Sequence, residues 1–498
     1  MAGQPSVLAL AAQRWPDKAS RLSGGFYKIK GKDGVVVPFR MNADQAEFMA
    51  NRHGMDVILK ARQKGFTTVI QIDMLDDCLF LPNTAAGVIA HNLNDAKAFF
   101  ADKIKFAYDN LPEAFRSVVA AEVDAADSMK FSNGSSIRVG TSLRSGTLQR
   151  LHVSEYGKLC AKYPEKAREV KTGAFNTVQA GQSITVESTA EGQAGDFFAM
   201  CEAAKRKADA DEALSVLDFK FHFSPWYTSD EYRLDPIGVV ITQEMADYFD
   251  KVEADCGVEL DAEQRAWYVK KAEQQGEDVK REFPTTAKEA FEASVEGAYF
   301  SVQMTTARKQ GRICKLPVLD APVYTTWDLG LNDSTAITFW QDVGHERRAI
   351  DYYENNGESW GHYSGILLVK GYSYSRHYFP HDGAQRQQGA DSIKTKWQIA
   401  QEAGINPTEL LGRIPTDKHG IDAARAFFPN VYIDEVRCAR LIRCLDNYRK
   451  QWDDKLAVWK DVARHDEFSH GYKSFEGAAI RPVSNGSGKI NYSSRGVV

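Results

Sequence analysis

The chain has 498 residues, of which 43% are hydrophobic and 26% charged, and its formal net charge is −5. This length exceeds one ordinary core and predicts two or three domains, and the composition is that of a soluble globular protein. No apolar run approaches the roughly 18 residues of a membrane helix, and the apolar start at residues 7–12 has no basic residue ahead of it, so we expect no signal peptide. The seven cysteines are scattered without a CxxC pair. That spacing argues against a zinc site and a disulfide framework, and it suits a reducing cytosol.

The first part of the chain combines a turn-rich start with a helix signal. Residues 1–38 are mixed in composition, and we expect them to form an N-terminal arm. From Asn42 the pattern is that of a capped helix, with Asn42 or Asp44 as the N-cap. Gln45 lies early in this helix, just before a candidate nucleotide loop, and could contact an adenine. An exposed helical glutamine is the alternative.

A candidate phosphate loop follows this helix. A β-rich run over residues 56–60 leads into a loop that ends at Gly65, and a long helical pattern continues through Phe80. Strand, glycine loop and helix form the geometry that cradles phosphate, because backbone N–H groups and the helix dipole face the anion. An ordinary strand-turn-helix is the alternative.

The loop departs from the motif G-x-x-x-x-G-K-[ST]. Gly65 and Thr67 match it, whereas Lys60 stands in place of the first glycine and Phe66 in place of the lysine. Thr67 could reach a magnesium ion through its hydroxyl, and Thr68 follows it. Three cations that surround the loop could replace the missing lysine: Lys60, Arg62 and Lys64.

Apolar strand patterns alternate with helical patterns in the first half of the chain. The strand patterns fall at residues 56–60, 87–90, 135–140, 148–153 and 183–188. This alternation predicts an α/β fold with a mostly parallel sheet covered on both faces. Ligands bind at the carboxyl ends of the strands in such sheets. Because Thr67, Glu155 and Ser188–Thr189 fall at or just beyond predicted strand ends, we expect them to share one rim.

The second half of the chain predicts a different sheet. Residues 324–328 form a buried strand that ends in Asp328, and a tight turn and a second strand follow. Residues 347–354 predict a third antiparallel strand, and residues 377–381 a further strand that leads to Asp382. Three antiparallel strands followed by alternating helices and strands is an RNase H-like order.

Asp328 and Asp382 are expected to converge at one edge of that sheet. Clustered carboxylates repel each other, and two divalent metal ions between them can activate water and stabilise the leaving oxygen in phosphodiester cleavage. Oxygen ligands favour Mg²⁺ or Mn²⁺. Glu354 at the end of the third strand is a further possible ligand. The alternatives are a turn-capping role for Asp328 and a solvated edge-strand carboxylate for Glu354.

Four motifs in sequence order give the chain a family resemblance. They lie at residues 60–67 (KARQKGFT), 152–156 (HVSEY), 187–192 (ESTAEG) and 327–330 (WDLG). The ordered set resembles the large terminase subunits of tailed bacteriophages, the motors that package DNA into proheads, over roughly residues 39 to 480.

The resemblance implies that residues 60–68 form a variant Walker A loop. An arginine near the start of the loop and a lysine share the phosphate charge in that family. Arg62 fits the arginine, and the lysine is Lys60 or Lys64. Thr67 would hold magnesium.

The resemblance also assigns roles to the next two strand ends. Residues 151–155 would be Walker B, with Ser154 in place of the usual aspartate and Glu155 as the base that orients the attacking water. Ser188 and Thr189 would belong to the motif that couples hydrolysis to DNA movement. Arg144 would stabilise charge on the γ-phosphate, and an exposed loop arginine is the alternative.

The closing motif of the family resembles residues 465–475, and its metal-binding aspartate falls at Lys473. Either Asp466 takes over as the third acid, or the lysine itself contacts the scissile phosphate. Asp466, Ser469 and Lys473 are spaced to share one helical face.

The resemblance therefore implies an α/β protein with two catalytic domains. The expected regions are an arm at 1–38, a P-loop-type ATPase domain at 39–222, a linker or hinge at 223–320, an RNase H-like nuclease domain at 321–483 and a flexible tail at 484–498.

The implied function is a viral genome-packaging motor that uses ATP and Mg²⁺ or Mn²⁺. It would move double-stranded DNA into a prohead and cut concatemers in the host cytoplasm, as a ring of subunits with a portal protein and a small terminase subunit. The rivals are a helicase or translocase with an inactive nuclease domain, and a nucleic-acid-binding structural protein with decayed sites.

Overall fold

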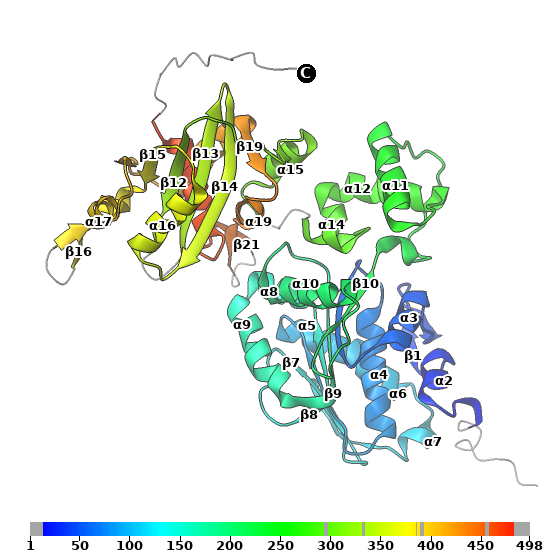
Figure 1. The fold of residues 1–498 in the computed structure, drawn as a ribbon. Helices are drawn as coiled ribbons and strands as arrows, with labels where there is room; N and C mark the ends of the chain where they lie inside the picture. The colour runs from blue at the N-terminus through cyan, green and yellow to red at the C-terminus, as the bar shows by residue number, and fades with distance from the viewer. Residues whose placement is uncertain are drawn as a thin grey trace, which may run out of the picture. The chain divides into compact units, whose positions relative to one another are not determined.

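The protein is described by a computed structural model that covers residues 13–292, 297–330, 334–384, 386–388, 393–453 and 458–482 (Figure 1). The chain separates into two compact units, Met1–Ser294 and Val295–Val498. The expected flexible tail at 484–498 lies outside the described residues. Among the described residues, no helix has both the length and the apolar character needed to cross a bilayer.

The first unit is built on an eight-stranded sheet in the order β10-β3-β9-β8-β4-β7-β6-β5. The strands in that order are β10 (Lys220–Ser224), β3 (Met55–Lys60), β9 (Val178–Ser188), β8 (Leu148–Ser154), β4 (Ala85–Ile89), β7 (Ser136–Gly140), β6 (Ser128–Phe131) and β5 (Ala121–Asp124). All neighbours from β10 to β7 are parallel, and the two remaining pairs, β7–β6 and β6–β5, are antiparallel. The expected mostly parallel sheet is confirmed, and the carboxyl ends of β3, β8 and β9 lie at one edge.

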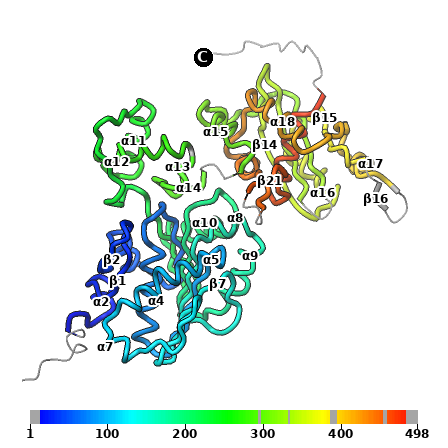
Figure 2. The backbone as a smooth tube through the Cα atoms, turned by 180° about the vertical axis from the view of Figure 1, so that it is seen from behind, coloured from blue at the N-terminus to red at the C-terminus, as the bar shows by residue number. Residues whose placement is uncertain are grey.

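Helices cover both faces of this sheet. One face packs α3 (Ala43–Asn51), α4 (Phe66–Phe80) and α6 (Phe106–Asp109), and the other packs α8 (Tyr156–Lys162), α9 (Pro164–Glu169) and α10 (Gly195–Asp209). Figures 1 and 2 show α4 and the α8–α10 group on opposite sides of the strands. Along β3, Ile58 belongs to one core while Val57 and Leu59 belong to the other. This alternation is what a strand buried on both faces requires.

The described part of the N-terminal arm is docked on α4. Leu22, Phe26 and Tyr27 are buried in the same core as α4, and α2 (Lys18–Ser23) carries Arg21 into an ion pair with Asp76. The arm from residue 13 onward is therefore an integral part of the first unit.

The boundary between the units falls inside residues 223–320, the region expected to form a linker or hinge. In the first unit lie α11 (Gln243–Cys256), α12 (Ala262–Gln275), α13 (Val279–Glu282) and α14 (Ala287–Glu292). Trp226, Tyr268 and Phe283 form a buried cluster here with Ala61 of the candidate phosphate loop. In the second unit lie α15 (Ser301–Lys309) and β11 (Ile313–Cys314). The high charge of the helices lies on their solvent faces and conceals this aromatic core in the sequence.

The second unit is built on a seven-stranded sheet in the order β11-β19-β14-β13-β12-β15-β18. Besides β11, its strands are β19 (Val431–Asp434), β14 (Glu346–Asn356), β13 (Ser334–Val343), β12 (Val323–Asp328), β15 (Tyr374–Phe379) and β18 (Thr408–Leu410). β12, β13 and β14 are antiparallel neighbours, and β15 runs parallel to β12. The expected RNase H-like order is confirmed.

Two groups of helices enclose the second sheet. On one face α20 (Ser469–Ile480) packs with α18 (Asp417–Phe427) and α19 (Ala439–Asn447), and on the other lie α16 (Trp360–Lys370) and α17 (Lys396–Glu402). Trp327 is buried in the core on the α16 face, whereas the next residue, Asp328, contacts α20. The strand period thus delivers the carboxylate to the α20 face.

Candidate functional site

The loop of the first unit has the expected strand-loop-helix geometry. Gly65 caps α4 with a φ of 76°, which favours glycine, and Gln63 also has a positive φ of 59°. A side chain at Gly65 would meet the Gln45 amide nitrogen at 2.4 Å. The N-terminus of α4 is the positive end of the helix dipole, where backbone N–H groups of the first turn can bind an anion. The backbone here can therefore cradle a phosphate.

Neighbouring elements hold this loop from outside. The Ala61 and Arg62 N–H groups donate to the carbonyls of Ser224 and Glu282, each at 2.9 Å. The Gln45 side chain is 4% exposed, caps its own helix through Asn42, and donates to the Gly65 carbonyl at 2.9 Å. The buried Gln45 is therefore not the exposed helical glutamine of the alternative. Its amide positions the loop, and its contact with an adenine stays a prediction.

The three candidate cations of the loop have different partners. Lys60 Nζ lies 3.0 Å from Glu187 Oε2 and 3.5 Å from Glu155 Oε1. Lys64 is fully buried and donates to Asp44 at 2.7 Å and to Thr228 at 2.6 Å. Arg62 is half exposed and pairs with Glu282 at 3.0 Å. Lys60 is thus the cation that joins the loop to the ends of the neighbouring strands.

The other residues of the loop, Phe66, Thr67 and Thr68, each pack against or hydrogen-bond to a neighbouring residue. Phe66, at the usual lysine position, is buried with its ring edge-on to Phe48 of α3. Thr68 is mostly buried in the first turn of α4, and its N–H donates to the Gly65 carbonyl at 3.1 Å. The Thr67 hydroxyl points to the strand ends, where Glu187 accepts its hydrogen bond at 2.7 Å.

Glu187, which the sequence reasoning gave no role, is the centre of this site. It is fully buried near the end of β9, and its Oε1 accepts hydrogen bonds from Thr67 and Ser154, each at 2.7 Å. Burial alone would raise the pKa of Glu187, but the Lys60 ammonium holds that pKa well below its usual range. The signal that could have found it is that Glu187 is the only acid in the β9 strand and lies next to its end.

Glu155 directly follows β8 and has a left-handed backbone, with φ 55° and ψ 40°. Its carboxylate lies 3.0 Å from Lys158 as well as near Lys60. Burial favours the neutral acid, but Lys60 and Lys158 lower the pKa of Glu155 below its ordinary value. A strained conformation at a strand end, holding an ionised carboxylate beside the loop, is typical of a functional position.

Ser188 and Thr189 are fully buried next to Glu187. Within the described residues, neither hydroxyl has a hydrogen-bond partner. A side chain at Gly157 of α8 would lie 2.8 Å from Ser188 Oγ and 2.7 Å from the Thr189 carbonyl. The end of β9 therefore packs directly against the helix that follows Glu155.

The structure does not bring Arg144 to this site. Its side chain is 58% exposed and pairs with Glu169 at 2.8 Å. This is the arrangement of the exposed loop arginine that the sequence left as the alternative.

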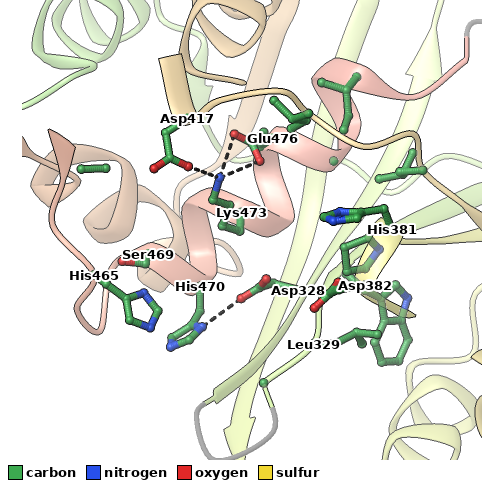
Figure 3. Close-up of a pocket in the computed structure, with 18 of the residues that line it drawn as sticks. Asp328, Leu329, His381, Asp382, Asp417, His465, Ser469, His470, Lys473 and Glu476 are labelled. Atoms are coloured by element: carbon green, nitrogen blue, oxygen red, sulfur yellow. Dashed lines mark hydrogen bonds and ion pairs between the residues drawn. The ribbon is translucent and has the colours of Figure 1, made fainter. Parts of the chain in front are cut away.

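The second unit contains a pocket of about 650 Å³ between the end of β12, the turn after β15 and α20. Asp328 and Asp382 both line it (Figure 3). His470 of α20 donates from Nδ1 to Asp328 Oδ2 at 2.9 Å. Burial raises the pKa of Asp328, and the charge of Asp382 raises it further against the opposing effect of His470. The two predicted carboxylates thus share one pocket and repel each other.

Lys473 lines the same pocket, one helical turn beyond His470. Its ammonium lies 3.1 Å from Asp417 and 3.0 Å from Glu476 (Figure 3). Tyr472 donates to Glu476 at 2.6 Å, so the carboxylate that holds the lysine is itself fixed.

Asp466, the candidate for a third acid, does not line the pocket. α20 begins at Ser469, so Asp466 precedes the helix and does not share its face with Lys473. Its carboxylate accepts the Phe468 N–H at 3.0 Å and pairs with Arg464 at 3.2 Å, and it does not line the pocket. The expected common helical face is therefore wrong, because the chain before Ser469 turns away from the helix.

Glu354 is also held away from the pocket. It shares a register row with Asp328 through Ala336, so both side chains lie on one face of the sheet, two strands or about 10 Å apart. Tyr352 donates to Glu354 at 2.8 Å and Arg440 at 3.1 Å. These two hydrogen bonds hold the Glu354 carboxylate outside the pocket.

We tested whether the pocket residues fit a divalent metal ion. Across the described ranges, no group of three His, Cys, Asp or Glu side chains is arranged to hold one. Mg²⁺ is often held by only one or two carboxylates, with water completing its coordination. A cation between Asp328 and Asp382 would relieve the repulsion that raises the Asp328 pKa. The donor set therefore fits one divalent cation.

No protein-family model matches the chain, and no curated protein matches it. Among solved structures, the large terminase of bacteriophage HK97 is 12% identical, with 93% of this chain and 98% of that chain covered and a TM-score of 0.42. The large terminase of a thermophilic bacteriophage, in complex with ATP-γ-S, is 10% identical, with coverages of 88% and 98% and a TM-score of 0.31. The nuclease domain of the bacteriophage SPP1 large terminase, with bound Mn, is 16% identical, with coverages of 32% and 84% and a TM-score of 0.26. These solved structures are large terminases, the family that the sequence motifs resemble.

Proposed function

We propose that the chain is a large terminase subunit, which hydrolyses ATP to move double-stranded DNA into a prohead and cuts concatemeric DNA with a metal-dependent nuclease. One observation carries this proposal. A single chain combines a phosphate-type loop joined to Glu187 in its first unit with the Asp328–Asp382 pocket in its second. A motor that moves and cuts DNA requires both an ATP site and a site for phosphodiester cleavage.

In the first unit, the loop N–H groups and Lys60 would bind the phosphates, with Arg62 near the loop entrance. Thr67 and Ser154 would hold Mg²⁺, because both hydroxyls converge on Glu187. Glu155 would orient the attacking water. Removal of such preorganised groups typically costs about a hundredfold or more in rate.

In the remainder of the ATP site, Ser188 and Thr189 would couple hydrolysis to movement. Arg144 would act on a nucleotide after the loop rearranges or on a neighbouring subunit. Gln45 would act by holding Gly65.

In the second unit, Asp328 and Asp382 would hold Mg²⁺ or Mn²⁺, which supplies Lewis-acid activation of water when bound. His470 keeps the Asp328 carboxylate oriented into the pocket. The chain would grip duplex DNA through phosphate contacts, so binding should weaken as salt rises. The partners would be a portal protein, a small terminase subunit and further copies of the chain in a ring, in the host cytoplasm.

A second candidate is an ATP-driven helicase or translocase whose nuclease domain is inactive. The observation that favours it is Lys473, an ammonium bound in the pocket where a metal ligand would be useful. Strand separation driven by ATP, without metal-dependent cutting, would support this candidate.

The test uses the full chain with supercoiled plasmid and Mn²⁺ or Mg²⁺, and measures ATP turnover in parallel. We expect Asp328→Ala and Asp382→Ala to abolish cutting while ATP turnover persists, and Glu155→Gln to show the reverse. Glu402→Gln, an exposed acid paired with Lys394 outside the pocket, is the matched control. A wild type that neither cuts DNA nor turns over ATP, even with proheads present, would leave only a binding or structural role.

A further inference from the structure

We propose that the pocket of the second unit holds one divalent cation, between Asp328 and Asp382, and that the Lys473 ammonium occupies the place of a second cation and contacts a phosphate of the DNA. This inference rests on the proposed nuclease function and refines it.

The fold places the Lys473 side chain in the same pocket as Asp328, where a second cation would otherwise bind. His470 and Lys473 are three residues apart on α20, so they share a face. His470 reaches Asp328, and Lys473 lines the same pocket with 32% of its side chain exposed. A ligand in the pocket can therefore meet both the carboxylates and the ammonium.

The ammonium is held as a fixed charge. Asp417 accepts from Lys473 at 3.1 Å, and both oxygens of Glu476 lie within 3.2 Å of it. Glu476 is 4% exposed, and a side chain at Gly420 would overlap it, so its own position is rigid. Glu476 and Asp417 raise the pKa of Lys473 against the effect of burial. The lysine therefore stays charged at neutral pH.

The carboxylates have capacity for one cation. Asp328 Oδ2 is engaged by His470, which leaves its other oxygen for a metal ion. Two metal ions about 4 Å apart need a ligand that reaches both. The two other acids of the pocket, Asp417 and Glu476, are already bound to Lys473. A second divalent cation would face both a shortage of ligands and repulsion by the ammonium.

The positive charge of the Lys473 ammonium suits contact with a phosphate. An ammonium has three donors, and a lysine acts as a point charge toward phosphate. In the proposed arrangement, the metal ion and Lys473 would both lie beside one phosphodiester group, and together they would offset its charge.

The first experiment counts Mn²⁺ ions bound per full-length chain without nucleotide, by electron paramagnetic resonance titration. The number of Mn²⁺ ions bound by wild type minus the number bound by Asp328→Asn gives the number of ions in this pocket. We expect one ion for wild type and Lys473→Arg, which keep the positive charge, and two for Lys473→Asp, which removes that charge and adds a carboxylate ligand. Lys370→Gln is the matched control, because Lys370 is similarly exposed and pairs with Asp351 at 2.6 Å, outside the pocket.

Each outcome separates the inference from the function on which it rests. A wild-type difference of two ions, with cutting intact, overturns the inference and leaves the nuclease standing. A difference of zero without cutting overturns both. A folded Lys473→Asp protein that still binds one ion shows that the ammonium does not occupy the second position. If that variant does not fold, the wild-type count decides.

The second experiment tests the phosphate contact without catalysis. Duplex DNA binding is measured with Ca²⁺ at several salt concentrations. Loss of one phosphate contact should reduce the slope of log affinity against log salt by about 0.9 in Lys473→Gln. An unchanged slope, equal to that of Lys370→Gln, would overturn the contact.

Discussion

Lys60 in the first unit and Lys473 in the second each lie between two carboxylates, but their surroundings differ. Lys60 is 6% exposed between Glu187 and Glu155 at the ends of parallel strands. Lys473 is 32% exposed on a helix, and its partners Asp417 and Glu476 are different residues from Asp328 and Asp382 of the same pocket.

This difference determines what each site needs. In the first unit Lys60 pairs directly with Glu187 and Glu155, and its charge lowers the pKa of both carboxylates. In the second unit Lys473 is bound by Asp417 and Glu476, and burial raises the pKa of Asp328 although the charges of His470 and Lys473 oppose the rise. In the first site Lys60 already balances charge on the two carboxylates before a ligand binds. In the second site an added cation would reduce the repulsion between Asp328 and Asp382.

The largest expected effect tests the role of Lys60 in the first site. Lys60→Met should lower ATP turnover by about a hundredfold or more, because the phosphates lose a preorganised positive charge. The measurement is ATP turnover per folded molecule.

Lys64→Met is the matched variant for this test. It also leaves a buried carboxylate without its lysine, at Asp44, but it removes no charge from the strand ends. We expect both variants to lose stability and only Lys60→Met to lose turnover. The opposite pattern would return the phosphate role to Lys64.

The second prediction concerns stability. Glu187→Gln removes the buried partner of Lys60 and should lower the free energy of unfolding by about 3–5 kcal/mol. Glu169→Gln, which removes the partner of exposed Arg144, should cost less than about 1 kcal/mol. Denaturant titrations of both variants measure the difference. Equal losses would mean that Glu187 is not the centre of the first site.

Sequence patterns were sufficient to predict which residues lie at the strand ends. Asp328 and Asp382 were predictable because strand period and chain order fix where an acid after a buried strand lies. The loop was predictable for the same reason, since Gly65 and Thr67 stand between a buried strand and a helix.

The choice between the lysines was not predictable. The Lys64 ammonium is bound by Asp44 and Thr228, whereas Lys60 is the lysine that reaches the strand ends. Thr228 lies 164 residues away from Lys64 in sequence. Glu187 becomes central only when the ends of β3, β8 and β9 meet. Asp466 looked helical because its spacing fits, but a helix start depends on local hydrogen bonds such as the one from Phe468.

The third prediction uses pH to contrast the two sites. The folded pKa of Glu187 lies below its ordinary value of 4.5, so the unfolded chain binds more protons and the stabilisation is lost as pH falls below that value. The folded pKa of Asp328 lies above its ordinary value of 3.8, so its ionisation costs stability as pH rises.

Without metal at pH 7, Asp328→Asn should therefore raise the melting temperature, by an amount on the order of a few degrees. Glu187→Gln should lower it. Both differences should shrink on acidification through the region of the ordinary pKa values. Melting curves of the two variants against pH would contradict the contrast if both differences had the same sign.

The smallest expected effect concerns Arg144, which tests whether the first site is complete within one chain. Arg144→Ala should leave ATP turnover of the isolated chain unchanged and cost less than about 1 kcal/mol, because the exposed guanidinium contacts Glu169 and no loop residue. A loss that arises only with proheads and DNA would mean that Arg144 acts on a nucleotide in the assembled ring. A loss already present in the isolated chain would place the arginine at its own γ-phosphate, and the loop at residues 141–147 would then have to move when ATP binds.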